Sequence, residues 1–123
     1  MKLSPMLPAA AALSALLLSG AALADDVMKK DGVLVNGAGM TVYTFDKDAA
    51  GSGKSVCNGP CAEAWPAVAA PASVAAPYSV VTRDDGARQL AYQGKPLYTF
   101  KKDGKPGERN GDNFKDIWHV VKE

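Results

Sequence analysis

Two cysteines and one histidine are the side chains whose types could do redox or metal chemistry in this chain. Cys57 and Cys61 lie four residues apart, and His119 is the only histidine. If the residues between the cysteines form one helical turn, the two Cα atoms come within about 6 Å, which suits a disulfide. The spacing is one residue longer than the thioredoxin motif, so we expect a static disulfide. A redox-active pair, or a metal site that also uses His119, is the alternative.

Acidic and aromatic residues are the second group of candidates. Trp65 and Trp118 could offer a platform for a ligand, and Asp84, Asp85 and His119 could add polar contacts, so these five residues form the candidate ligand surface. The acidic pair falls in a predicted turn, where carboxylates commonly accept backbone hydrogen bonds. A catalytic acid–base pair also requires a cleft and shifted pKa values. We therefore predict no catalytic residue, and an enzyme is not expected.

Two loop sequences match ligand-binding motifs only in part. The segment 51–55, Gly-Ser-Gly-Lys-Ser, lacks the first glycine of a phosphate-binding loop, because Asp48 occupies that position. Asp46 and Asp48 begin like a calcium loop, but Cys57 stands where the loop needs its bidentate glutamate. The sequence thus predicts no nucleotide, metal or other cofactor.

The elements that would position these residues are mostly β-strands. Strand-forming runs bounded by turn residues predict two hairpins and two further strands, at 33–36 with 40–45, 78–83 with 88–93, 97–100, and 116–121. One short helix is predicted at 61–65, near the cysteines, with Asn58 as its cap and Pro60 in its first turn. The segment 67–77 is rich in alanine and proline and indicates an irregular connection.

An internal repeat divides the chain into two related units. The two copies occupy residues 39–48 and 94–103, and at a constant offset of 55 positions Gly39, Tyr43, Thr44, Phe45 and Asp48 recur as Gly94, Tyr98, Thr99, Phe100 and Asp103. Because side chains alternate along a strand, the tyrosine and phenylalanine of each copy share a face and should pack in a common core. Each aspartate should fix the turn after its strand. The predicted fold is mainly β: a small antiparallel sandwich or barrel built from two related β units, with one short helix near the cysteines.

The repeated residues resemble a known signature. Tyr43-x-Phe45-x-x-Asp48 and Tyr98-x-Phe100-x-x-Asp103 are similar to the motif of a bacterial secreted-repeat family, predicted lipoproteins with a Yx(FWY)xxD motif. The segments between the copies follow that family's order as well: Cys57-x-x-x-Cys61-Ala62, Trp65-Pro66 and Arg83-Asp84-Asp85-Gly86. The resemblance covers nearly all of the chain after its N-terminal segment. It implies an exported protein and brings no established reaction to these residues.

The N-terminal segment itself predicts export. Lys2 gives it a positive start, residues 7–18 are almost wholly apolar but short for a membrane span, and Ala22-Leu23-Ala24 fits a signal peptidase site. We expect residues 1–24 to be a signal peptide that is cleaved after Ala24, and residues 25–123 to form a single domain.

No lipid anchor is expected on this chain. Leu18-Ser19-Gly20 resembles the run before a lipoprotein's modified cysteine, but Ala21 follows in place of the cysteine. Removing Lys2 with the signal leaves 14 − 1 = 13 basic residues against 13 acidic ones. A balanced charge of this kind favours neither nucleic acid nor an anionic membrane as a partner.

These observations together predict an exported protein, periplasmic or secreted, that has no enzymatic activity. We expect it to bind a partner or a small ligand in the cell envelope through its loops. The competing hypothesis is a redox-active or metal-handling protein that uses Cys57 and Cys61 with help from His119.

Overall fold

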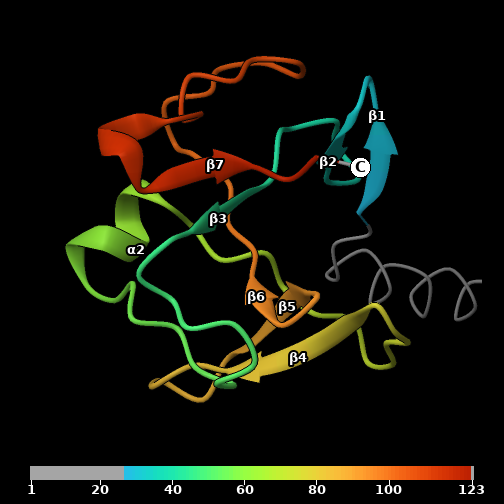
Figure 1. Ribbon diagram of the computed structural model, residues 1–123, viewed down its shortest axis with the longest axis vertical. Coiled ribbons are helices and arrows are strands. Elements are labelled where there is room, and N and C mark those ends of the chain that lie inside the picture. The colour runs from blue at the N-terminus through green and yellow to red at the C-terminus, as the bar shows by residue number, and fades with distance from the viewer. Residues whose placement is uncertain (1–26, 123) are drawn as a thin grey trace, which may run out of the picture.

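The computed structural model describes residues 27–122 of the chain. The predicted signal peptide and its cleavage site after Ala24 lie outside the described residues. Strands, turns and loops make up most of the described part, and its single α-helix, α2 (Pro60–Ala64), is five residues long (Figure 1).

The strands form three small antiparallel sheets. Their members are β1 (Met28–Lys30) with β2 (Val33–Val35), β3 (Tyr43–Phe45) with β7 (Trp118–Val120), and β4 (Tyr78–Thr82) with β5 (Arg88–Tyr92) and β6 (Lys95–Pro96). A short 3-10 helix, η1 (Phe114–Asp116), precedes β7. In Figure 1, β4, β5 and β6 lie together on one side of the β3–β7 pair. The predicted mainly β, antiparallel fold with one short helix is confirmed, and the described strands do not close into a barrel.

The two predicted hairpins differ in how closely the structure follows them. The second forms as predicted, because Gly86 supplies the positive φ, +88°, that the tight turn between β4 and β5 requires. In the first, β2 pairs along its length with β1 and meets the following segment at only one bridge, between Val35 and Thr41. The chain after Thr41 instead leads into β3, whose partner is β7.

The helix spans Pro60–Ala64, one residue earlier than the predicted 61–65, and Asn58 does not cap it. Gly59 is the capping residue, and no side chain bonds to the free amides of the first turn. The Asn58 side chain is engaged elsewhere, because its amide donates to Asp84 Oδ2 at 3.3 Å and its Oδ1 accepts from Arg83 at 3.4 Å. A long-range contact has replaced the local one.

The two repeat copies meet at their tyrosines. Tyr43 and Tyr98 face each other across an antiparallel bridge, in which each amide donates to the other carbonyl, at 2.7 Å and 2.9 Å. Equivalent residues of the two copies therefore lie on either side of an approximate two-fold axis. This axis relates the stacked rings and the tyrosine–aspartate bonds described below.

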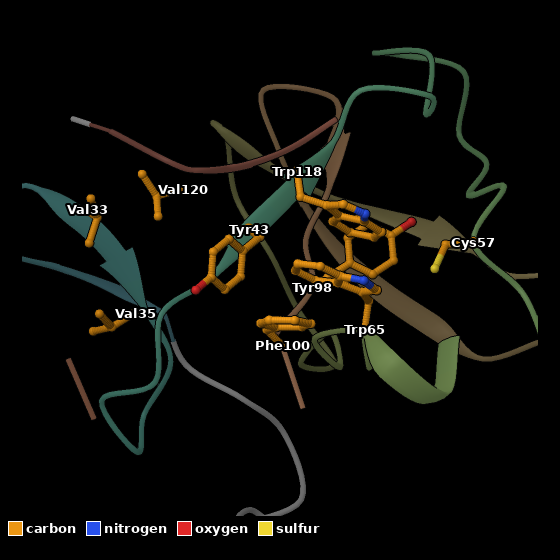
Figure 2. Packing of buried hydrophobic residues seen from close by; sticks show 9 residues of the cluster. All are labelled: Val33, Val35, Tyr43, Cys57, Trp65, Tyr98, Phe100, Trp118 and Val120. Atoms are coloured by element: carbon orange, nitrogen blue, oxygen red, sulfur yellow. The ribbon is translucent and has the colours of Figure 1, made fainter. Parts of the chain in front are cut away.

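An aromatic stack occupies the centre of the molecule. Four rings lie face to face in the order Phe45, Trp118, Trp65, Phe100, with centroid separations of 4.1, 3.7 and 4.0 Å. We call them the four-ring stack. Figure 2 shows the two indoles side by side, with Phe100 next to Trp65. Each motif phenylalanine thus stacks on the tryptophan of the other repeat.

The motif tyrosines pack against the edges of this stack. Tyr43 meets Trp65 at 5.4 Å and Tyr98 meets Trp118 at 5.2 Å, both edge to face. Both tyrosines are completely buried. The expectation that the repeated aromatic residues share one core is confirmed. A second buried cluster is formed by Leu34 of β2, Leu90 of β5, and Val42, Val68 and Leu97.

The stack requires a glycine beside it. A Cβ atom on Gly111 would lie 2.6 Å from Trp65 Cη2 and 3.0 Å from Phe100 Cδ2, closer than packed carbon atoms approach. Because both rings are held in the four-ring stack, neither can move aside without breaking a stacked contact.

We expect Gly111→Ala to lower the free energy of unfolding by about 1–3 kcal/mol, through overpacking of the stack. Gly104→Ala is the matched control, since its Cβ would meet only Glu108 Oε1 at an ordinary 3.6 Å. Urea denaturation followed by near-UV circular dichroism measures both variants. Equal stability of the two would contradict the steric argument.

Candidate functional site

The repeated tyrosine and aspartate side chains form crossed hydrogen bonds between the two copies. Tyr43 donates to Asp103 Oδ2 at 2.6 Å, and Tyr98 donates to Asp48 Oδ2. Each tyrosine therefore bonds to the aspartate of the other motif copy and not to its own. Both carboxylates are buried, at 6 % exposure each, so the cross-links lie inside the protein.

The second oxygen of each aspartate holds a loop. Asp48 Oδ1 accepts the amide of Val56 at 2.7 Å, and Asp103 Oδ1 accepts the amide of Asn110 at 2.9 Å. Each aspartate was expected to fix the turn after its strand. In the structure, each carboxylate accepts an amide from the loop that follows it. The crossed partners could not be predicted from the sequence, because the motif spacing describes only one copy at a time.

Burial raises the pKa of both motif tyrosines well above their ordinary value of about 10. For Tyr43, the bond to the Asp103 carboxylate is the next cause, and for Tyr98 it is the bond to Asp48. Both effects disfavour the phenolate, because a buried anion beside a carboxylate loses water and gains repulsion. Both hydroxyls therefore stay protonated, as donors, through the physiological pH range.

A buried arginine extends one of the two cross-links. Arg83, which is 8 % exposed, donates to Ser55 Oγ at 3.1 Å, to Gln89 Oε1 at 2.7 Å and to the Cys57 carbonyl. Ser55 Oγ in turn contacts the Tyr98 hydroxyl. The guanidinium and the Asp48 carboxylate are thus joined through two neutral hydroxyls. Such a network offsets the cost of burying both charges.

Cys57 and Cys61 form a disulfide, with their Cα atoms 5.2 Å apart. Cys57 is fully buried and Cys61 is half-buried at the start of α2. The bond from Arg83 to the Cys57 carbonyl ties this small loop to the end of β4. The predicted disulfide is confirmed, while the hypothesis of a redox-active pair stays a prediction.

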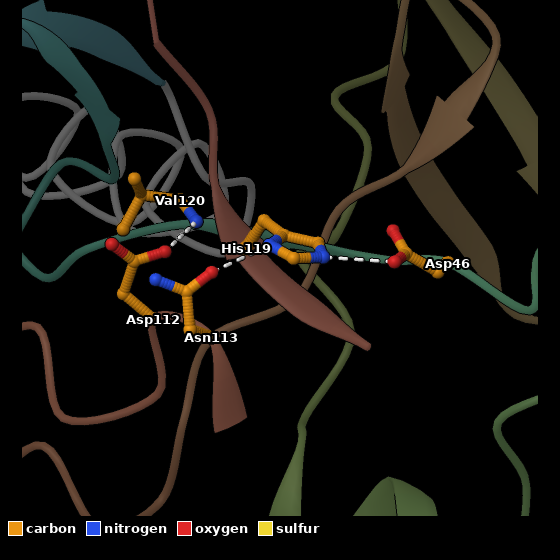
Figure 3. Close-up of polar contacts among 5 residues, drawn as sticks. All are labelled: Asp46, Asp112, Asn113, His119 and Val120. Carbon is orange, nitrogen blue, oxygen red and sulfur yellow. Dashed lines mark hydrogen bonds and ion pairs between the residues drawn. The ribbon is translucent and has the colours of Figure 1, made fainter. Parts of the chain in front are cut away.

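His119 lies apart from the cysteines, on the outer side of the β3–β7 pair. Its Nε2 is 2.8 Å from Asp46 Oδ2 and its Nδ1 is 3.1 Å from Asn113 Oδ1 (Figure 3). Asp112 Oδ1 accepts the amide of Val120 at 3.1 Å on the same strand. These bonds fasten the loop before η1 to β7. Within residues 27–122, no three or more His, Cys, Asp or Glu side chains are grouped to hold a metal ion.

The proposed ligand-surface residues do not converge. Trp65 and Trp118 are buried in the four-ring stack, at 4 % and 3 % exposure. Asp84 accepts from Asn58, and Asp85 caps its own turn by accepting the Ala87 amide at 2.9 Å. The cavity that touches both indoles includes neither acid nor His119.

That cavity is an open groove of about 360 Å³ along one side of the four-ring stack. Its apolar lining outside the stack comes from Cys61 and Ala64 of α2 and from Phe114 and Ile117. We call it the aromatic groove. The apolar lining residues outside the stack are partly exposed, whereas the two indoles are buried and stacked on each other. The packing of the core therefore determines the shape of the groove.

Two lysines complete the lining of the aromatic groove, Lys102 and Lys115. Sequence reasoning missed both of them, as well as Phe114 and Ile117. One feature of the sequence pointed weakly to Lys102: it directly precedes Asp103 of the second motif copy. No such feature pointed to the residues of η1, because they reach the groove only through an irregular loop.

Comparison with known proteins places the chain in one family. The chain belongs to a family described as a secreted repeat of unknown function, whose sequence pattern matches residues 27–69 and 79–122. The two matches correspond to the two repeat units, and the family's description supports an exported protein. No curated protein and no solved structure matches the chain. Among residues 27–122, no helix is long and apolar enough to cross a membrane.

A double-mutant cycle tests the crossed hydrogen bonds. Tyr98→Phe should cost about 1–3 kcal/mol of unfolding free energy, because Asp48 Oδ2 loses its buried donor. The coupling energy measured with Asp48→Ala should be about 1 kcal/mol or more, whereas the coupling of Tyr98 with Asp103 of its own copy should be near zero. Tyr92→Phe, on β5 and outside both motifs, is the control. A larger coupling within one copy would refute the crossed arrangement.

Alkaline pH should destabilise the fold. The folded state holds the protons of Tyr43 and Tyr98 more tightly than the unfolded chain does, so unfolding releases protons once the unfolded phenols ionise. The stabilisation is fully present below about pH 10 and declines as the pH rises further. Denaturant midpoints measured at intervals from about pH 8 to pH 11 should fall only above pH 10, and Tyr98→Phe should flatten that fall. A flat profile in the unmodified protein would count against the buried, protonated phenols.

Proposed function

We propose that this exported protein is a non-enzymatic binding module of the cell envelope, periplasmic or secreted, and that a small ligand occupies its aromatic groove. The observation that carries the proposal is the groove itself. Its apolar walls and its two lysines surround about 360 Å³, a volume within the range of small-molecule sites.

The geometry of the core supports a preformed site. The lining includes Trp65 and Trp118, whose rings are stacked parallel with their centroids 3.7 Å apart. Tyr43 and Tyr98 brace their edges, and the crossed hydrogen bonds hold those tyrosines in turn. A ligand would meet rings that need little reordering, and the entropic cost of binding falls when a site is already ordered.

The interlocking of the two copies also supports treating residues 25–123 as one domain. The groove takes Phe45 and Trp65 from the first repeat unit and Phe100 and Trp118 from the second. Neither unit could form the stack alone, since each phenylalanine stacks on the other unit's tryptophan. The proposed site therefore depends on both units.

Intrinsic fluorescence tests the proposal, because both tryptophans of the chain lie at this groove. Two probes with the same ring system are titrated, neutral N-phenylnaphthylamine and anionic anilinonaphthalene sulfonate. We expect saturable, one-to-one energy transfer from tryptophan to at least one of them. The near-UV circular dichroism of the protein should keep its native form throughout.

Ala64→Leu should weaken probe binding by about tenfold, because the larger side chain projects into the groove. Ala62→Leu is the matched control, since Ala62 lies in the same helix and does not line the groove. Failure of both probes to give saturable transfer would refute the proposal, as would equal weakening by the two variants.

A further inference from the structure

We infer that the ligand of the aromatic groove is an aromatic anion, a flat ring system that carries an acidic group. This inference rests on the proposed function and names the class of ligand. Its first support is charge. The residues that line the groove include two cations, Lys102 and Lys115, and no carboxylate. The whole chain carries 14 basic and 13 acidic residues, yet the charged residues of this lining are all positive.

Both repeat copies carry the first cation, but only the second copy places it at the groove. Lys102 directly precedes Asp103, and its equivalent in the first copy is Lys47, 55 positions earlier. Lys47 is exposed and does not line the groove. The two-fold relation therefore breaks here, where Phe114 and Lys115 of η1 join Lys102 in the lining.

The second cation sits on a strained segment. Asn113, Lys115 and Asp116 have φ angles of +63°, +52° and +62°, in the left-handed region that residues with a Cβ rarely adopt. Strain of this kind persists only where the surroundings impose it, and it gathers at ligand clamps and similar sites. Here it brings Phe114 and Lys115 to the groove.

Several hydrogen bonds hold the strained segment in place. The Asn113 amide donates to the Trp118 carbonyl at 2.7 Å, and Asn113 Oδ1 faces His119 Nδ1 (Figure 3). The Asp116 amide donates back to the Asn113 carbonyl at 2.9 Å. The Asp46 amide donates to the Ile117 carbonyl at 2.8 Å, so the segment is anchored on both sides of Lys115. The backbone that carries the exposed Lys115 is therefore held in place at the groove's edge.

The position of the Lys115 ammonium group indicates how an anion would be held. Its Nζ lies 5.6 Å from the centroid of the Phe114 ring, which is itself part of the groove wall. A ring system placed against the aromatic walls would bring an attached acidic group within reach of this ammonium group. The walls would bind the rings, and Lys102 and Lys115 would select the charge.

The matched probes distinguish this inference from the proposed function. Anilinonaphthalene sulfonate should bind about tenfold more tightly than N-phenylnaphthylamine, and raising the salt concentration should reduce that preference. Lys102→Gln and Lys115→Gln should each weaken sulfonate binding by about threefold relative to binding of the neutral probe. Lys47→Gln, the equivalent position in the first copy, should change neither.

Each outcome decides between the two claims. Equal affinity for the two probes, or equal weakening by Lys47→Gln and Lys102→Gln, would overturn the anion inference while the binding site itself stands. Binding of neither probe would remove the proposed function. Lys115→Gly adds an independent readout: it should raise the Tm by about 4 °C by relieving the strain, yet reduce sulfonate binding. A lower Tm would overturn the strained-clamp argument.

Discussion

The crossed hydrogen bonds between the tyrosine of one repeat copy and the aspartate of the other are the constraint on which the structure depends. A buried carboxylate without a donor is costly, and neither Asp48 nor Asp103 receives a hydroxyl from its own copy. The two copies must therefore fold against each other. Once Tyr43 and Tyr98 pair across the axis, their rings brace the indoles, and the phenylalanines of both copies close the stack.

The features that distinguish this molecule lie where the two-fold relation breaks down. On one side of the axis, Arg83 joins the Tyr98–Asp48 link through Ser55 and ties down the disulfide loop at Cys57. Beside Phe100, η1 brings Phe114 and Lys115 up to the stack and creates the aromatic groove. The symmetric part thus supplies a rigid core, and the unsymmetric additions supply a surface on which a ligand could be recognised.

How far the sequence predicted each element depended on how local its determinants were. The hairpin of β4 and β5 could be predicted closely, because alternation and an Asp-Gly turn specify it within some fifteen residues. The helix cap could not be predicted, since the Asn58 side chain bonds to Arg83 and Asp84 and not to an amide of the helix. The partner of β3 was equally hidden, because β7 lies more than seventy residues away in the chain.

The sequence by itself determined the mainly β composition of the fold, the two motif copies and the pairing of Cys57 with Cys61. All of these follow from short-range spacing, from composition or from a repeat that can be seen by comparing the chain with itself. Only the tertiary structure decided that each aspartate serves the other copy's tyrosine and that the tryptophans are buried. It also decided that two lysines stand beside them. Those are contacts between distant segments, and their partners are selected by the packing of the whole chain.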